Sequence, residues 1–418
     1  MASHSPPPPP PAAAKSASPP IATTILSLTD DLLREIFLRL PSLPSLIRAA
    51  LSCRAFLAAV RSSPAFRRSF RELHPPPLLG FFFDSDGSKI SCFTPVRRSS
   101  DPDLAAAVRR ADVFLTRVPC PDDAFPGWQI MDCRGGRLLL CNSRNEQIVV
   151  YDPLTGALDL LPSPPHNKFS HGHRGKLIPM DYFLLCSGDE ARHRGLSFRV
   201  VSLCHDKSRL RAAIFSSATK EWQILPWSGP MPEQPASGKY WLLKGTQLNG
   251  LLCWSHSKHS YMAVLDSSTW QFSRIDLPEI LMGQGHLYCA GCTKDGKLCI
   301  VAALAFILLV WFRKADAANG NVERWMLETV IPLEDVLLQV TEGSREDHGA
   351  LKVMGILDGI VYLSTWETFR DSTLPCWYLS FCLETRKLEK LFYTKTDGCS
   401  HPYIMAWPTS LVGSSSSS

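Results

Sequence analysis

A turn that contains a threonine recurs along the chain, and it limits the fold more than any other feature of the sequence. In each copy an apolar run ends in a small polar turn, and a leucine or aromatic residue follows three positions later; the threonines are Thr155, Thr219, Thr269 and Thr385. They lie 64, 50 and 116 residues apart, and the longest gap holds a degenerate copy with Trp325 in the aromatic position. A glycine that opens an apolar strand recurs with this unit; these glycines are Gly136, Gly250, Gly296 and Gly359.

One unit therefore reads as strand, hairpin, strand, turn and strand over roughly 50–60 residues, which is typical of the blades of a β-propeller. Counting Leu78–Val118 as a further blade, we expect an all-β propeller of about six to seven blades over residues 78–412. Trp222, Phe272 and Trp325 should then occupy equivalent buried positions in successive blades. The alternative is a β-sandwich in which similar turns coincide.

The longest apolar run, Leu298–Phe312, has fifteen residues. A membrane-spanning helix needs about 20, so we interpret this run as two buried strands with a bend at Ala302-Ala303 and expect no membrane partner. The 14 cysteines are scattered, many of them inside apolar runs where a free thiol behaves as a small hydrophobe. No segment resembles a secretory signal, so we expect reduced thiols and a location in the cytoplasm, the nucleus or both.

The ends of the chain differ in composition from the rest. Residues 1–24 are a Pro/Ala/Ser-rich tail that cannot bury a core, and residues 413–418 form a frayed tail of serines after Gly413. Residues 25–74 predict a small all-α module of three short helices; these are Asp30–Leu40, about Ser45–Val60 and a third that begins at Ser63-Pro64. So small a core is marginal, and such a module usually depends on a partner.

Two stretches of this module resemble the F-box family. Residues 28–41 (LTDDLLREIFLRLP) resemble the opening of an F-box and residues 52–56 (SCRAF) its later part, although Thr29 stands where the family usually has proline. The rest of the chain resembles the F-box-associated β-propellers of large plant families; the matching stretches are 215–226, 265–278, 296–325 and 401–408. The resemblance implies a non-catalytic substrate receptor of a Skp–cullin–F-box ubiquitin ligase. Its partners would be a Skp-type adaptor, through it a cullin, and an unknown target protein.

The first helix and its neighbours carry more apolar side chains than so small a module can bury, which favours a docking face for a partner. With the residues that the resemblance adds, the expected adaptor-binding set is Leu28, Asp31, Leu32, Leu33, Glu35, Ile36, Phe37, Leu40, Pro41, Leu46, Cys53 and Arg54. The alternative is that these helices simply pack on the propeller. Residues 26–74 hold eight arginines and no lysine, which suits an acidic protein partner, whereas nothing indicates a nucleic-acid-binding helix.

Motifs for catalysis or metal binding are weak. Residues 291–297 fit a phosphate-binding loop, but leucine follows where Ser or Thr must bind Mg²⁺, so an Asp295-Gly296 hairpin turn explains the match better. Cys289 and Cys292 form a single C-x-x-C, and His171-Gly-His173 lies in a loop rich in Gly and Pro. We therefore predict no catalytic residue, no metal and no cofactor.

The target should be bound by irregular polar insertions, because the loops of a propeller gather on its two flat faces. The candidate loops are His166–Gly175, Pro230–Lys239 and Thr341–Gly349, and the candidate target-binding residues are His171, His173, Arg174, Arg345 and Glu346. A second hypothesis is a propeller enzyme or small-ligand-binding protein with an incidental helical module. An enzyme would gather titratable residues at one mouth of the propeller.

Overall fold

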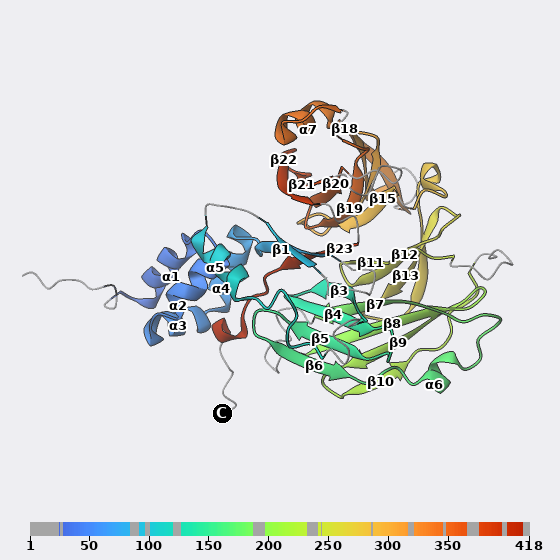
Figure 1. Cartoon of the computed structure of the whole chain (residues 1–418), viewed down its shortest axis with the longest axis horizontal. Coiled ribbons are helices and arrows are strands. Elements are labelled where there is room, and N and C mark those ends of the chain that lie inside the picture. Colours follow the sequence, from blue (N-terminus) through green and yellow to red (C-terminus); the bar gives the residue numbers. More distant parts are fainter. Residues whose placement is uncertain are drawn as a thin grey trace, which may run out of the picture.

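The computed structural model describes most of the chain. The described residues are 25, 28–83, 92–96, 101–119, 127–186, 197–231, 241–243, 245–285, 287–316, 322–345, 348–365, 376–394 and 399–412. The predicted tails, 1–24 and 413–418, lie outside them. A helical module is followed by six antiparallel sheets arranged as a six-bladed propeller, which confirms the expected fold class (Figure 1).

Residues 28–83 contain four helices rather than the three expected: α1 (Asp30–Leu38), α2 (Leu43–Ala50), α3 (Arg54–Arg61) and α4 (Pro64–Leu73). The prediction of one helix over residues 45–60 was wrong, because this segment forms the two helices α2 and α3. The Ser52 hydroxyl donates to the carbonyl of Ala49 over 2.7 Å, and Cys53 is extended at φ −154°. A serine hydroxyl that donates to a carbonyl of the preceding turn competes with the backbone hydrogen bonds of the helix, and this ends α2.

Five of the six blades have four strands each, ordered from the first strand to the last across the sheet. Blade II consists of β3 (Trp128–Arg134), β4 (Arg137–Asn142), β5 (Ile148–Asp152) and β6 (Ala157–Leu161). Blade III consists of β7 (Ile178–Cys186), β8 (Phe198–His205), β9 (Leu210–Ser216) and β10 (Glu221–Ile224). Blade IV consists of β11 (Thr246–Leu248), β12 (Leu251–Ser255), β13 (Tyr261–Asp266) and β14 (Phe272–Asp276). Blade V consists of β15 (Tyr288–Cys292), β16 (Leu298–Leu304), β17 (Ile307–Asp316) and β18 (Val322–Pro332), and blade VI of β19 (Lys352–Leu357), β20 (Ile360–Ser364), β21 (Cys376–Cys382) and β22 (Leu388–Thr394).

Blade I closes the ring with strands from both ends of the propeller. Its sheet has the order β2-β1-β23, in which β1 (Leu78–Phe83) and β2 (Cys92–Pro95) join β23 (Ser400–Ile404). The expectation that residues 78–118 form a blade by themselves was therefore wrong. Where a fourth strand would follow, Asp101 accepts hydrogen bonds from the amides of Asp103 and Leu104 and starts the helix α5 (Pro102–Arg110). An N-cap aspartate followed by proline at the first helical position favours a helix at this point.

The recurring threonine belongs to the turn between the third and fourth strands of a blade. In all four copies the next residue has a left-handed backbone: φ is 71° at Gly156, 60° at Lys220, 57° at Trp270 and 59° at Arg386. Each of these amides donates to the carbonyl four residues before it. The repeat in the sequence is thus a repeated turn geometry, which places the residue three positions after the threonine on the outer strand.

The aromatic positions agree with the sequence expectation in part. Trp222 and Phe272 occupy one register position, opposite Phe215 and Leu265, but Trp325 lies opposite Arg313 in a longer hairpin. All three are half-buried rather than buried. The indole N–H of Trp222 donates to the carbonyl of Pro162, and that of Trp325 to the carbonyl of Asp276. These two tryptophans therefore link the outer strands of adjacent blades.

The long apolar run forms two strands as predicted, β16 and β17. The turn between them lies at Ala305-Phe306, where Ala305 has φ 53°, and not at residues 302–303. The Asp295-Gly296 segment is a hairpin turn between β15 and β16, also as predicted. None of the described helices has the length and apolar character needed to cross a membrane.

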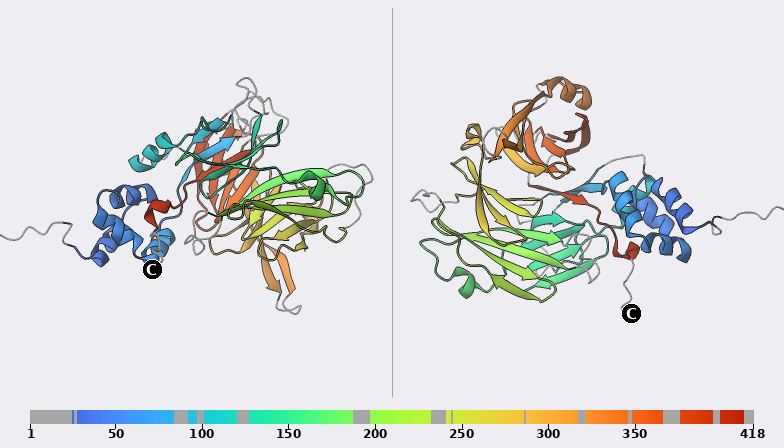
Figure 2. Two further views of the ribbon diagram at one scale, coloured as in Figure 1. Left: turned by 90° about the horizontal axis from the view of Figure 1, so that it is seen from below. Right: turned by 180° about the vertical axis from the view of Figure 1, so that it is seen from behind.

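Because neighbouring strands are antiparallel, the loops of each blade alternate between two faces of the ring. The near face, which carries the hairpins between first and second strands, also carries the helical module: Lys294 in the β15–β16 hairpin donates to the carbonyl of Glu72. The far face carries the loops between second and third strands and the connections between blades, including the helices α6 (His166–Ser170) and α7 (Glu334–Thr341). The helical module stays at one end of the molecule in each view of Figure 2.

A paired glycine experiment tests the turn geometry. Gly250, in the β11–β12 hairpin, has φ 82°, whereas Gly355 in β19 has an ordinary φ and no atom within 4 Å of an added Cβ. We expect Gly250→Ala to lower the free energy of unfolding by about 1–2 kcal/mol because alanine is strained in the left-handed region. Gly355→Ala should leave it equal or slightly higher. Equal losses in urea denaturation would contradict the hairpin geometry.

Candidate functional site

The outer face of α1 presents two apolar side chains to solvent. Leu32 is 48% exposed and Ile36 is 42% exposed, and they lie one helical turn apart. Charged residues border them, with Arg39 bonded to Glu35 over 2.7 Å. We call Leu32, Ile36 and their charged neighbours Asp31 and Glu35 the α1 stripe.

The other residues of the predicted adaptor-binding set divide by burial. Asp31, Glu35, Pro41 and Arg54 are exposed, like Leu32 and Ile36, and Leu28, Leu40 and Cys53 are half-buried. Leu33, Phe37 and Leu46 are buried, at 2%, 3% and 0% exposure. These three side chains belong to the hydrophobic core and not to the exposed surface; the Phe37 ring, for example, packs edge-on against Phe56 at 5.4 Å.

The orientation of α1 is fixed by Arg34 and by the backbone before it. The Arg34 guanidinium donates to the carbonyl of Ala59 over 2.9 Å and pairs with Asp31 at 2.8 Å, so α1 is bonded to α3. Thr29 has φ −67° and ψ 156°, dihedral angles that proline also adopts. The chain thus enters α1 in the direction that the usual proline would give.

The helices α2 and α4 of the module pack against the propeller, so the alternative interpretation also holds in part. Ser45 and Arg48 of α2 both bond the carboxylate of Asp103 at the start of α5, over 2.8 and 3.0 Å. On α4 the ring of Phe70 packs edge-on against Trp407 at 5.9 Å, and one hydrophobic core includes both. Beside these contacts with the propeller, Leu32 and Ile36 of α1 remain exposed.

A groove of about 1950 Å³ separates the module from blades V and VI on the near face. The segment 73–78, α2 and the start of α5 form one wall, and the first hairpins and last turns of the two blades form the other. No motif in the sequence pointed to this groove, because its walls come from segments about 200 to 300 residues apart.

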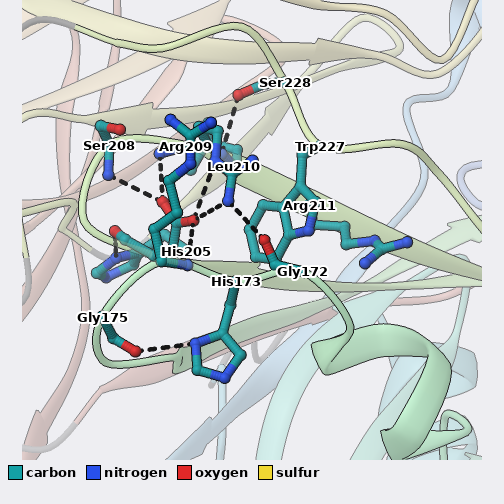
Figure 3. Close-up of polar contacts among 12 residues, drawn as sticks. Gly172, His173, Gly175, His205, Ser208, Arg209, Leu210, Arg211, Trp227 and Ser228 are labelled. Carbon is teal, nitrogen blue, oxygen red and sulfur yellow. Dashed lines mark hydrogen bonds and ion pairs between the residues drawn. The ribbon is translucent and has the colours of Figure 1, made fainter.

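On the far face a second site lies at the seam of blades II and III (Figure 3). The buried carboxylate of Asp206 accepts hydrogen bonds from the Arg209 guanidinium and from the amides of Arg174, Ser208 and Arg209. Burial raises the pKa of Asp206, but these hydrogen bonds outweigh it and leave the pKa below its ordinary value. Asp206 is therefore an ionised anchor for the loop that follows α6.

Two arginines and a tryptophan hold the same loop. The carbonyl of His171 accepts from Arg211 over 2.7 Å and from the indole of Trp227 over 3.0 Å, and Arg209 donates to the carbonyl of Gly172 over 2.8 Å. Both guanidinium groups also lie over the Trp227 ring, at 4.8 and 5.3 Å. The loop is consequently fixed by many contacts, although it was predicted only as an irregular insertion.

The structure brings together some of the predicted target-binding residues and not others. His171, His173 and Arg174 lie together on the far face with exposed side chains. Arg345 lies between blades V and VI, paired with Glu334 at 3.1 Å, and Glu346 lies outside the described residues. Sequence reasoning missed Arg209, Arg211 and Trp227, for which the Arg-x-Arg pair at 209–211 was the available signal.

A histidine in the neighbouring blade gives a pH prediction. His256 is 1% exposed, and its Nδ1 accepts hydrogen bonds from the amides of Lys258 and His259, both over 2.9 Å. Burial, and then His259 and Lys258, lower the pKa of His256 to about 4. A histidine whose folded pKa lies below its unfolded value of about 6.5 contributes stability that is present at higher pH and is lost on acidification.

We therefore expect the unfolding temperature to fall between pH 6.5 and pH 4, and part of this fall to disappear in His256→Gln. The variant should be less stable at pH 7 because the loop loses its acceptor, but its loss on acidification should be smaller. Scanning calorimetry of both proteins at pH 7 and pH 4.5 measures the difference. An equal loss in the two proteins would show that His256 is not held neutral.

The cysteine and metal motifs of the sequence can be compared with the described residues. Within them there is no group of three or more His, Cys, Asp or Glu side chains that could hold a metal ion. Burial raises the pKa of Cys292 to about 11 and that of Cys299 to about 12, so these thiols stay protonated at neutral pH. The C-x-x-C pair consists of free thiols in β15, with Cys289 bonded to the carbonyl of Val353.

Comparison with known families agrees with the two-part architecture. Residues 25–68 match the F-box domain, and residues 129–411 match the family described as F-box protein AT5G49610-like, beta-propeller. An F-box joined to a propeller is the architecture of a ubiquitin ligase substrate receptor in general. This chain belongs to the F-box protein AT5G49610-like β-propeller family.

Other comparisons add only a distant likeness in fold. No curated protein matches the chain. Among solved structures, a nidogen/laminin complex aligns over 78% of this chain and 96% of that chain at 11% identity and a TM-score of 0.36. An oligogalacturonate lyase in complex with manganese aligns over 69% and 78% at 10% identity and a TM-score of 0.35. These values carry no conclusion about function.

Proposed function

We propose that this protein is the non-catalytic substrate-recognition subunit of a Skp–cullin–F-box ubiquitin ligase. The α1 stripe binds a Skp-type adaptor, which connects the chain to a cullin, and the propeller binds the target protein. The observation that carries the proposal is the exposure of Leu32 and Ile36 in a domain that contacts the propeller through α2 and α4 instead. Exposed apolar side chains at helical spacing form a surface that a partner helix can bury.

The contacts between the two parts suit this role. The F-box and blades I and II share one hydrophobic core, and Arg61 of α3 donates to the carbonyl of Ser410 over 2.7 Å. A target held on the far face would therefore keep a fixed position relative to the adaptor. A fixed geometry limits the entropy lost when target and ligase are brought together.

The proposal is tested by co-expression with a recombinant Skp-type adaptor and a cullin. We expect a stable complex on size-exclusion chromatography that contains one copy of each chain. A folded protein that elutes alone at micromolar concentration would overturn the proposal. No arrangement of described residues favours the enzyme hypothesis, so no second function is proposed.

The expected location is part of the same proposal. We propose that the protein acts in the cytoplasm, the nucleus or both, where cysteines stay reduced; each of the described cysteines is a free thiol. Fluorescence imaging of a tagged full-length chain tests this. Accumulation in a secretory compartment would contradict it.

A further inference from the structure

The far face is basic at the seam of blades II and III. Three segments meet there: residues 163–177 around α6, the β8–β9 loop at 206–211 and the β12–β13 loop at 256–260. Trp241 connects the last two, since its indole donates to the carbonyl of Asp206 over 3.0 Å and its ring lies 5.7 Å from that of His256. Together the three segments contain seven Lys and Arg residues and a single carboxylate, that of Asp206.

The cations of this seam have two different functions. Arg209 and Arg211 are both bonded to the loop backbone, and Arg209 is also bonded to Asp206, so the two arginines hold the surface in shape. The other five are exposed, and within the described part of the chain no carboxylate pairs with them. Lys258 lies on the β12–β13 loop, and the other four, Lys168, Arg174, Lys176 and Lys207, lie on the segment around α6 and on the β8–β9 loop. We call these four the seam cations. Their positive charge is not neutralised by the described neighbours: Asp206 is buried with Arg209, and Glu146 bonds His166 at 2.6 Å.

The charges on the far face are arranged differently between blades V and VI. Between blades V and VI the helix α7 begins with Glu334 and Asp335, and Glu342 follows its last turn. There the cations are paired, Arg345 with Glu334 and Lys390 with Glu342, both at 3.1 Å. The exposed cations of the seam thus differ from those between blades V and VI, which are paired.

We propose that the seam cations bind an acidic segment of the target protein, one rich in Asp, Glu or phosphorylated side chains; this proposal rests on the proposed function. Unpaired, exposed cations attract carboxylates and phosphates and speed their encounter. The loop that carries Arg174 is already held by Asp206, Arg211 and Trp227. The loop therefore loses little conformational entropy when the acidic segment binds.

A nucleic acid is the less favoured occupant. Proteins that bind single strands stack the bases on exposed aromatic rings along a basic groove. Of the tryptophan rings described at this seam, that of Trp227 is covered by the guanidinium groups of Arg209 and Arg211, and that of Trp241 is 2% exposed. Phe169 in α6 is 7% exposed and belongs to a hydrophobic core. The described tryptophan and phenylalanine rings of the seam are therefore covered, whereas its charges are exposed.

The experiment compares two variants of the full-length protein with equal changes of net charge. The seam variant replaces Lys168, Arg174, Lys176 and Lys207 by glutamine. The control variant replaces four lysines that form exposed ion pairs outside the three far-face segments by glutamine: Lys220, Lys297, Lys314 and Lys387. The backbone bonds of Arg174 do not involve its side chain, so the seam variant keeps the Asp206 anchor.

Two fluorescent peptides of equal length, one rich in Glu and one rich in phosphoserine, serve as probes in anisotropy titrations at physiological salt. We expect the seam variant to bind at least one of them about tenfold more weakly than the parent, and the control variant to stay within about twofold. Equal losses in both variants, or no binding of either peptide to the parent, would overturn the proposal. So would tighter binding of a single-stranded oligonucleotide than of both peptides. Capture of the Skp-type adaptor is measured on the same samples; if it is retained, failure concerns the seam alone and not the proposed function.

Discussion

Replacing Leu32 and Ile36 together by aspartate is expected to weaken adaptor binding by about a hundredfold or more. Both side chains are exposed, at 48% and 42%, so the substitution leaves the core of the F-box intact. In a complex the two aspartates would be buried without partners, and central contacts of this kind often contribute 2 kcal/mol or more each, so roughly a hundredfold is a conservative figure. Surface plasmon resonance with an immobilised Skp-type adaptor measures the loss.

The matched control replaces two exposed apolar side chains of the propeller. Ile280 and Leu304 are 65% and 59% exposed, and Ile280→Asp with Leu304→Asp adds the same charge. We expect this control to bind the adaptor with unchanged affinity and both variants to unfold at nearly the temperature of the parent. Full binding by the Leu32/Ile36 variant would remove the α1 stripe as the docking surface.

The second large effect is expected from Phe70→Ala in α4. Phe70 is 0% exposed, and its ring packs against Phe66, His74 and Trp407. Removing a buried phenylalanine costs about 3–5 kcal/mol in the free energy of unfolding. Because this core joins the F-box to the propeller, the loss should appear in the propeller signal as well as in the helical signal of a urea titration.

Two further variants separate this effect from a general one. Phe114→Ala removes a ring that is 72% exposed, so it should change the free energy of unfolding by less than about 0.5 kcal/mol. Trp407→Ala removes the partner of Phe70, and the double variant should lose less than the two single losses added together, because the rings are in contact. Strict additivity, or a helical transition that separates from an unchanged propeller transition, would show that the two parts do not share a core.

The propeller could be predicted because its signal is local. A threonine turn whose next residue has φ near 60° is formed by five or six neighbouring residues, and Gly156, Lys220, Trp270 and Arg386 show the same geometry in four blades. The glycines at the hairpins are a local signal of the same kind, because each is required by a positive φ in its own turn: 82° at Gly250 and 78° at Gly359. The F-box was visible for a similar reason, since Leu32, Leu33, Ile36 and Phe37 follow the helical period.

The sequence by itself thus determined the class of fold, the order of the two parts and the helix that carries the exposed stripe. Only the tertiary structure decided which side of α1 is buried. Leu33 and Phe37 are no more apolar than Leu32 and Ile36, and they are buried because α3 and α4 pack against their side of the helix. The tertiary structure also decided that β23 closes blade I beside β1 and that Arg211 and Trp227 hold the loop of His171. These are contacts between residues far apart along the chain, about 320 residues in the first case and 40 and 56 in the second. No local periodicity records such contacts, since their energy depends on which surfaces the folded chain brings together.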